Sequence, residues 1–478
     1  MMRNKNTGSR KNFRMSLWTL MAAGFLAACG GKSMRGMIVF TQVEPEAFKI
    51  DSLTGGTWKY VERSRIVALD PNRPGVIAGV LTPGFVAARS PEISFDGNRM
   101  LFTGRKNAGD RWKIYEMNLE NHKVREVIAR KGDCTDPSYL PGNRIIFSSL
   151  NMDAKSKAGH TLYTCGLNGC CLSQVTYHPN SDFSPSVLHD GRVVAITWPV
   201  YPRTGKPIYL SFRPDGTKLE LYYNSEFTGW LPGKVRETDQ GQIVFVESGS
   251  SSDGHGKLVS LSKGRPLSSR AELPGEEGGS FYSVYPGAGG KLLVSYHSAG
   301  SARFGIYEYN PELKKMGKRL YSDDPYNSIE PVLVTAHQRP RDLPSEIVET
   351  NKSGLVMCMN SDNSTLPAGK NEKTESIRIL GLGGPIQDIP VEPDGSFYID
   401  LSANRPVQIE TLGKSGEVLR GPCAWIWIRP NERRGCIGCH EEKEMAPENK
   451  VVDAIKKMPV KVPIPGTTSE GKSAITAK

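Results

Sequence analysis

The chain has 478 residues, enough for two or three domains of ordinary size. Only 38% of the residues are hydrophobic, whereas 50 glycines and 33 prolines supply many turns, and this composition favours many short strands over long helices. The formal net charge is +11, but no run of lysine and arginine with interleaved aromatic side chains occurs, so we exclude nucleic-acid binding.

Residues 1–28 have the pattern of a lipoprotein signal peptide. A basic start is followed by an apolar run, Met15–Ala28, that is too short to span a bilayer comfortably. The run ends in Leu26-Ala27-Ala28-Cys29, in which the Cys29 thiol would take a diacylglycerol; an ordinary cleavage site is the alternative. We therefore expect a lipid-anchored protein of the bacterial cell envelope, on its periplasmic side or surface. Gly30, rather than aspartate, after the cysteine favours the outer membrane.

A repeat of about fifty residues occupies the region from residue 36 to residue 340, which is the length of a four-stranded propeller blade. The three clearest copies contain a small residue, a proline, an apolar strand, a glycine turn and a second strand, and two weaker copies keep the glycine turn and the second strand. The turn glycines are Gly97, Gly142, Gly191, Gly241 and Gly290.

The two ends of the repeat region hold complementary half-copies. Gly36–Phe40 is a second strand without a first one, and Ser328–Leu333 is a first strand without a second one. Side by side they complete another blade and leave no open sheet edge. We therefore predict a six-bladed β-propeller over residues 29–340, closed by its N-terminal strand.

Residues 341–430 are predicted to form a small β-sandwich-like domain, because short apolar strands recur there between turns such as Asp394-Gly395. Residues 431–465 follow as a separate segment, with one short helix expected between Val451 and Met458. Residues 466–478 are polar and rich in small residues, and we expect a disordered tail. The fold class is therefore all-β, a propeller followed by a sandwich-like domain.

The sequence Cys436-Ile437-Gly438-Cys439-His440 is the signature of c-type haem attachment. Its two thiols would bind the vinyl groups of one porphyrin edge, and His440 is placed to bind the iron. A redox Cys-x-x-Cys or half of a zinc site is the alternative, but the export signal favours haem, which is attached outside the cytoplasm. Because little chain follows the motif, we expect the haem to pack against the sandwich and the propeller.

Further side chains are candidate ligands of the iron. Met445 and Met458 follow the motif, and His160, His178 and His189 belong to the propeller. A methionine ligand would raise the reduction potential and favour electron transfer, whereas an empty sixth position would leave room for a small molecule. Both alternatives stay open.

Three cysteines, Cys165, Cys170 and Cys171, flank one turn of the repeat region. Outside the cytoplasm a hairpin disulfide is the expected arrangement. A metal site is the alternative, with zinc shared between these cysteines, His440 and a propeller carboxylate. Cys358 and Cys423 are a candidate pair in the sandwich-like domain.

These features together resemble the hydrazine synthase alpha subunit family, and the repeats separately resemble WD40-like propeller repeats of the Tol-Pal type. The most specific stretches are Ser184–Arg192, Pro214–Thr217, Asp394–Phe397 and Arg429–Glu441. The resemblance implies a six-bladed propeller with one c-type haem, and makes zinc a second candidate metal at His440. The named enzyme of the family condenses ammonia with a hydroxylamine-level intermediate to give hydrazine.

The sequence departs from that enzyme in two places. The enzyme has a further haem domain downstream and a tyrosine that approaches the iron shortly after the motif. Here no second haem motif follows, and residues 441–478 contain no tyrosine. Both departures weaken the transfer of the enzyme's chemistry to this chain.

We therefore expect a lipid-anchored, extracytoplasmic monohaem cytochrome c that passes electrons to or from a partner protein. The alternatives are a haem oxidoreductase that acts on small nitrogen compounds, and an envelope scaffold with a structural haem.

Overall fold

The computed structural model describes residues 33–45, 48–50, 59–128, 130–151, 159–201, 205–225, 233–248, 255–364, 372–438 and 448–463. Cys29, Cys439, His440 and Met445, and the expected tail, lie outside these residues. No helix in the described part is long and apolar enough to cross a membrane.

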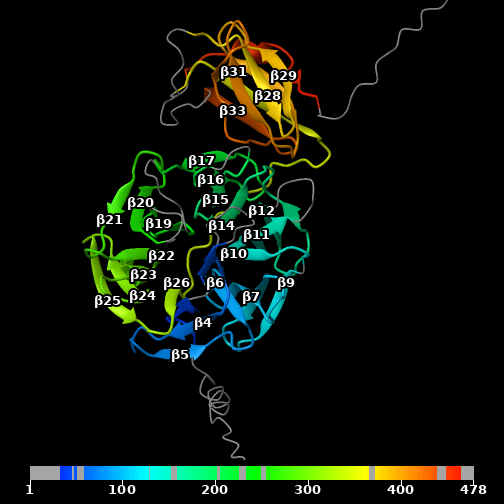
Figure 1. Ribbon diagram of the computed structural model, residues 1–478. Helices are drawn as coiled ribbons and strands as arrows, with labels where there is room; N and C mark the ends of the chain where they lie inside the picture. The colour runs from blue at the N-terminus through cyan, green and yellow to red at the C-terminus, as the bar shows by residue number, and fades with distance from the viewer. Residues whose placement is uncertain are drawn as a thin grey trace, which may run out of the picture.

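Six four-stranded antiparallel sheets form the blades of a propeller around a central channel (Figure 1). Blade 1 contains β26 (Asn327–Leu333), β1 (Ile38–Val43), β4 (Ser64–Leu69) and β5 (Ile77–Val80). Blade 2 contains β6 (Ala87–Ile93), β7 (Arg99–Arg105), β8 (Lys113–Asn118) and β9 (Val124–Ile128). Blade 3 contains β10 (Cys134–Leu140), β11 (Arg144–Asn151), β12 (Gly159–Gly166) and β13 (Ser173–Gln174).

The other three blades follow in chain order. Blade 4 contains β14 (Ser181–Val187), β15 (Val193–Trp198), β16 (Ile208–Phe212) and β17 (Glu220–Tyr223). Blade 5 contains β18 (Arg236–Glu237), β19 (Gln242–Glu247), β20 (Lys257–Ser262) and β21 (Ala271–Leu273). Blade 6 contains β22 (Ser280–Pro286), the 3-10 turn η2 (Ala288–Gly290), β23 (Leu292–His297), β24 (Gly305–Asn310) and β25 (Lys315–Tyr321), and a small hairpin of β2 (Phe48–Ile50) and β3 (Lys59–Val61) extends from blade 1.

The predicted closure of the ring is confirmed. β1 pairs antiparallel with β26, from Ile38 opposite Leu333 to Val43 opposite Asn327. Every side chain of β1 is buried. The two incomplete repeats therefore share one sheet, and the apolar surface of both is removed from water.

The small residue and proline of the repeat mark a bulge in the innermost strand. Ser90, Asp136, Ser184 and Glu330 each precede a proline and have φ between 49° and 54°. The pairing register shifts at each of these positions. The bulge lets the backbone N–H of one blade reach a carboxylate of another, as Ser184 N–H donates to Asp136 Oδ2 at 3.1 Å.

Buried and partly buried charges join the blades across the channel. Arg89 Nη2 lies 3.2 Å from Glu330 Oε1 and 3.6 Å from Asp136 Oδ1. Glu92 pairs with Lys234 at 3.4 Å and with Arg236 at 2.9 Å. Since these partners belong to different blades, the pairs hold the ring together around a cavity of only about 70 Å³.

Glu237 in β18, whose side chain is 3% exposed, predicts that the fold is sensitive to acid. Burial opposes ionisation of Glu237, but hydrogen bonds from His189 and Lys263 lower its pKa to about 2. The stabilisation is therefore complete above the ordinary glutamate pKa and is lost as the pH falls toward 2. Glu237→Gln should lower the free energy of unfolding at neutral pH by roughly 1.5–3 kcal/mol and flatten its decline in acid. Denaturant titrations at several pH values measure this, with the exposed Glu312→Gln as the control; parallel acid profiles would contradict it.

Two further four-stranded sheets form the predicted sandwich, which lies beside blade 4 (Figure 1). One contains β33 (Arg433–Gly438), β27 (Ser353–Asn360), β30 (Phe397–Ser402) and β34 (Val460–Lys461). The other contains β29 (Gly384–Pro390), β28 (Ser376–Gly381), β31 (Gln408–Leu412) and β32 (Val418–Arg420). The expected helix between residues 451 and 458 is a single 3-10 turn, η3 (Asp453–Lys456).

Candidate functional site

The first thiol of the haem motif lies on an edge strand of the sandwich. β33 is the outermost strand of its sheet and pairs in parallel with β27, so that Cys436 stands opposite Cys358. Cys436 is half-buried, and Gly438 is the last described residue of the motif. A sheet edge leaves one side of the strand without a neighbouring strand.

A buried carboxylate fixes the beginning of β33. Glu432 is 1% exposed and accepts hydrogen bonds from the backbone N–H of Lys218 and of Arg429, each at 2.8 Å. The guanidinium of Arg434 lies 2.9 Å from the same carboxylate. Lys218 belongs to blade 4 of the propeller, and its Nζ also donates to the carbonyl of Arg433 at 2.7 Å. The motif strand is therefore held by the propeller at its first residues.

The segment before the motif forms the contact between the two domains. Trp425 Nε1 donates to the carbonyl of Tyr201 at 2.9 Å, and Trp427 Nε1 donates to the carbonyl of Gly216 at 3.0 Å. The Trp427 ring packs 5.1 Å from the ring of His178. These indoles give the interface both apolar area and directional bonds.

Beyond this contact the strand leads along the sandwich. Cys436 comes three residues after Arg433, which at the rise of an extended strand places it about 10 Å farther along β33. The expectation that the haem packs against both the sandwich and the propeller stays a prediction. The described part of the motif belongs to the sandwich alone.

The described residues of the motif strand fit covalent attachment of a flat group. Gly435 is exposed, and a side chain in its place would meet only the Cε of Met357, at 3.9 Å. The outer face of the strand is therefore open beside the half-buried Cys436. Cys436 itself packs at the margin of the sandwich core and is half-buried, so a thioether would form at the edge of the sheet.

Met458 and the three histidine candidates do not belong to β33. Met458 is 87% exposed and follows η3 at the opposite edge of the sheet, three strand spacings or about 14 Å away. His160 is enclosed in blade 3, where burial lowers its pKa to about 3. His178 binds Asp182 at 2.8 Å, and His189 binds Glu237 at 3.4 Å. His160 and His189 are therefore engaged within the propeller, whereas His178 contacts both Asp182 and Trp427.

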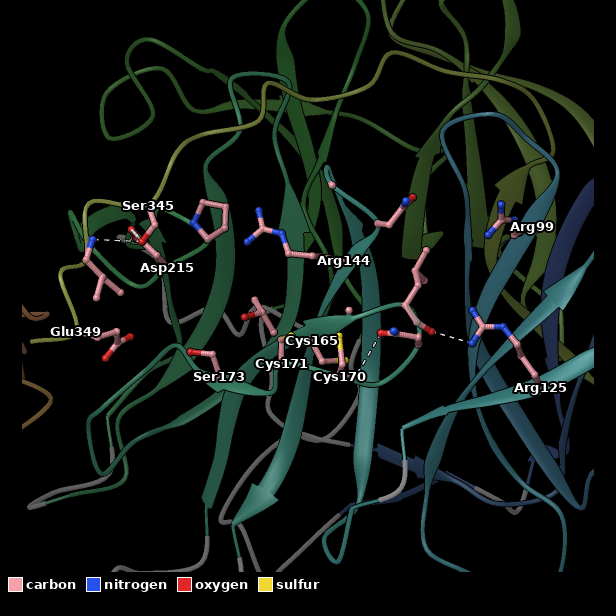
Figure 2. Close-up of a pocket in the computed structure, with 18 residues that line it drawn as sticks. Arg99, Arg125, Arg144, Cys165, Cys170, Cys171, Ser173, Asp215, Ser345 and Glu349 are labelled. Atoms are coloured by element: carbon pink, nitrogen blue, oxygen red, sulfur yellow. Dashed lines mark hydrogen bonds between the residues drawn. The ribbon is translucent and has the colours of Figure 1, made fainter.

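The three propeller cysteines border a cavity of about 750 Å³ between blade 3 and the linker to the sandwich (Figure 2). Cys165 is buried on β12, whereas Cys170 and Cys171 are exposed in the turn that follows. Arg99, Arg125 and Arg144 also line the cavity.

The expected hairpin disulfide is not formed in this structure, in which all three cysteines are thiols. The physical reason is that Cys165 points into the blade core while the other two face solvent. No three histidine, cysteine, aspartate or glutamate side chains in the described ranges converge on a metal. The described side chains therefore do not form the alternative metal site by themselves. The candidate pair Cys358 and Cys423 is likewise not joined by a disulfide.

Sequence reasoning missed the support of the motif strand. Glu432 was part of a family-like stretch, but nothing in its spacing marked it as a buried acceptor for residue Lys218, which is 214 positions away. A glutamate just before a strand, between arginines, more often lies on the surface. Only the contact between blade 4 and the sandwich reveals its role.

Comparisons with known proteins agree along most of the chain. Residues 345–441 match the family model described as the hydrazine synthase alpha subunit middle domain. A curated relative, hydrazine synthase subunit alpha from Kuenenia stuttgartiensis, is 24% identical over an alignment 535 positions long, which covers 84% of this chain. The chain spans 65% of the length of that relative.

One solved structure shows the same fold over most of the chain. Kuenenia stuttgartiensis hydrazine synthase superposes with a TM-score of 0.75 at 22% identity, covering 88% of this chain and 71% of that chain. TolB from Acinetobacter baumannii superposes with a TM-score of 0.40 at 13% identity, covering 63% of this chain and 67% of that chain.

Proposed function

Because this chain belongs to the hydrazine synthase alpha-subunit-like family, we propose that it is a lipid-anchored, extracytoplasmic cytochrome with one c-type haem, which passes electrons to or from a partner protein. The observation that carries the proposal is the position of Cys436, the first cysteine of the motif. It lies on the edge strand β33, whose first residues are held by the buried Glu432.

Different residues of the chain would hold the haem, position the motif strand and carry the lipid. Cys436 and Cys439 would form the two thioethers, and His440 would bind the iron from one side. When bound, the haem supplies a one-electron couple. Glu432 and Lys218 keep the strand that leads to the motif in a fixed position relative to the propeller. Cys29, if acylated, would keep the protein at the membrane.

The test is the mass and spectrum of the full chain, made with its own signal in a bacterium that attaches haem c. We expect one haem and a lipid on each chain, and complete loss of covalent haem in the Cys436→Ser/Cys439→Ser variant. Cys170→Ser, which changes an exposed propeller thiol, is the matched control and should keep its haem. Polypeptide without haem would contradict the proposal.

The spectrum of the ferrous protein separates the carrier from the enzyme. A carrier with six iron ligands should show a spectrum that carbon monoxide does not change. Rapid binding of the gas would contradict the carrier and favour a haem oxidoreductase acting on small nitrogen compounds. A redox titration that finds no accessible couple would favour the third alternative, an envelope scaffold with a structural haem.

The lipid anchor is tested separately by Cys29→Ser. If Cys29 carries the lipid, the variant should leave the membrane fraction and appear in the soluble envelope fraction, while its haem content stays the same. An unchanged membrane fraction would contradict anchoring through Cys29.

A further inference from the structure

The pairing of β33 with β27 places a second cysteine beside the haem motif. Cys358 is the register partner of Cys436 in the parallel pair. Both are thiols in this structure. We propose that an oxidising envelope joins these two cysteines in a disulfide before haem is attached, and that this bond must be reduced before Cys436 can accept haem. The second half of this inference rests on the proposed function, whereas the disulfide itself does not.

The backbone geometry permits the bond. Neighbouring strands of a sheet lie about 4.8 Å apart, and the Cα atoms of disulfide-bonded cysteines are about 4.4–6.8 Å apart. Paired residues of parallel strands point to the same face of the sheet. Cys358 is 1% exposed and belongs to the sandwich core, and Cys436 packs against that same core cluster. Both side chains therefore lie on the inner face of the sheet.

The other described sandwich cysteine, Cys423, also packs against this core cluster, but it lies outside the β33–β27 strand pair. The Sγ of Cys423 accepts a hydrogen bond from Ile409 N of β31 at 3.1 Å. It also lies 3.2 Å from the carbonyl oxygen of the next residue, Ala424. No other cysteine in the described ranges is placed beside Cys436 by strand pairing. Cys358 is therefore the partner that the fold assigns.

The chemistry balances with an exported protein disulfide as the oxidant. Two thiols and the oxidant's disulfide give the Cys358–Cys436 disulfide and the oxidant's two thiols. Attachment of haem then adds a cysteine S–H across a vinyl C=C bond, which forms one S–C and one C–H bond. A disulfide has no S–H to add, so a reducing dithiol must first return both hydrogens.

The same geometry makes the bond easy to reduce. Side chains at paired positions of parallel strands start about one strand spacing apart, which is wider than the Cβ separation of about 3.8 Å that a relaxed disulfide prefers. Strained disulfides are the labile and regulatory ones. A bond of this kind would protect the motif thiol and still yield to a mild dithiol.

Peptide mapping of the full wild-type chain tests the disulfide directly. The chain is made in an oxidising bacterial envelope without haem-attachment enzymes, its thiols are blocked, and it is digested without reduction. We expect the Cys358 peptide linked to the Cys436 peptide, and released by a low concentration of dithiothreitol. A fully alkylated Cys358, or a link from Cys436 to Cys439 or from Cys358 to Cys423, would overturn the proposal.

A second measurement tests the effect on haem attachment. In a haem-attaching host with limited reducing capacity, Cys358→Ser should raise the ratio of covalent haem to chain about twofold, and Cys423→Ser should leave it unchanged. An equal ratio in wild type and Cys358→Ser would overturn the gating step. If neither protein carries haem, the proposed function fails, while the peptide map still decides whether the disulfide forms.

Discussion

Replacing Glu330 by alanine is expected to destabilise the propeller by about 3–5 kcal/mol, because it removes one partner of a buried ion pair. Glu330 Oε2 accepts hydrogen bonds from Ser90 N at 2.8 Å and from Thr41 Oγ1 at 2.9 Å, and Oε1 lies 3.2 Å from Arg89. The substitution would deprive the buried Arg89 of its closest carboxylate at the seam between blades 1 and 2. Urea denaturation followed by tryptophan fluorescence measures the loss.

Two variants sharpen this prediction. Glu330→Gln keeps an acceptor for Ser90 N–H without the charge, and should fall between wild type and Glu330→Ala. Glu120→Ala changes an exposed glutamate of the β8–β9 turn and should stay within 0.5 kcal/mol of wild type, roughly the spread of surface substitutions. A loss below about 1 kcal/mol in Glu330→Ala would contradict the role of this carboxylate.

The Glu330 pair also has a defined pH dependence. Burial alone would raise the pKa of Glu330, but the Arg89 guanidinium, the Ser90 N–H and the Thr41 hydroxyl bring it below its ordinary value. The carboxylate therefore stabilises the fold above the ordinary glutamate pKa, and this contribution is lost as the pH falls through the lowered one. Glu330→Gln should lose that part of the acid dependence.

Replacing Glu432 by alanine is expected to release the motif strand from the propeller, at a cost of about 3–5 kcal/mol to the local stability of β33. The variant would leave the backbone N–H groups of Lys218 and Arg429 without their acceptor and Arg434 without its close carboxylate. Hydrogen exchange of the β33 amides measures the effect, because local opening there should become more frequent.

The matched control is Glu448→Ala, which changes a side chain that is 76% exposed. Its exchange pattern should equal that of wild type. Glu432→Gln should lie between the two, since an amide oxygen can still accept one N–H but carries no charge for Arg434. Unchanged exchange of β33 in Glu432→Ala would show that the strand is held by its pairing with β27 alone.

The propeller was accessible to sequence reasoning because blades repeat. Turn glycines such as Gly97 and Gly142 recur at the length of one four-stranded sheet, and Gly97 has the positive φ of 75° that the turn requires. The closing pair, β1 and β26, followed from two incomplete copies at the ends of one array. Both inferences rest on local patterns, and local patterns decide turns and strands.

The details of the candidate site were not accessible in the same way. The cysteines 165, 170 and 171 are neighbours in sequence and seemed suited to a disulfide, but alternation along β12 turns Cys165 into the core. Cys358 and Cys436 are far apart in sequence and are brought together by a parallel strand pair. In both cases the spacing along the chain does not determine which face of a strand a side chain occupies or which strand lies beside it.

The amino-acid sequence by itself determined the all-β class, the six blades with their closure, and the haem-attachment motif, since each of these depends on residues close together or on a regular repeat. Only the tertiary structure decided which side chains support that motif. The acceptor role of Glu432 and the partner of Cys436 both depend on contacts between distant segments, and such contacts exist only after the sandwich has packed on blade 4.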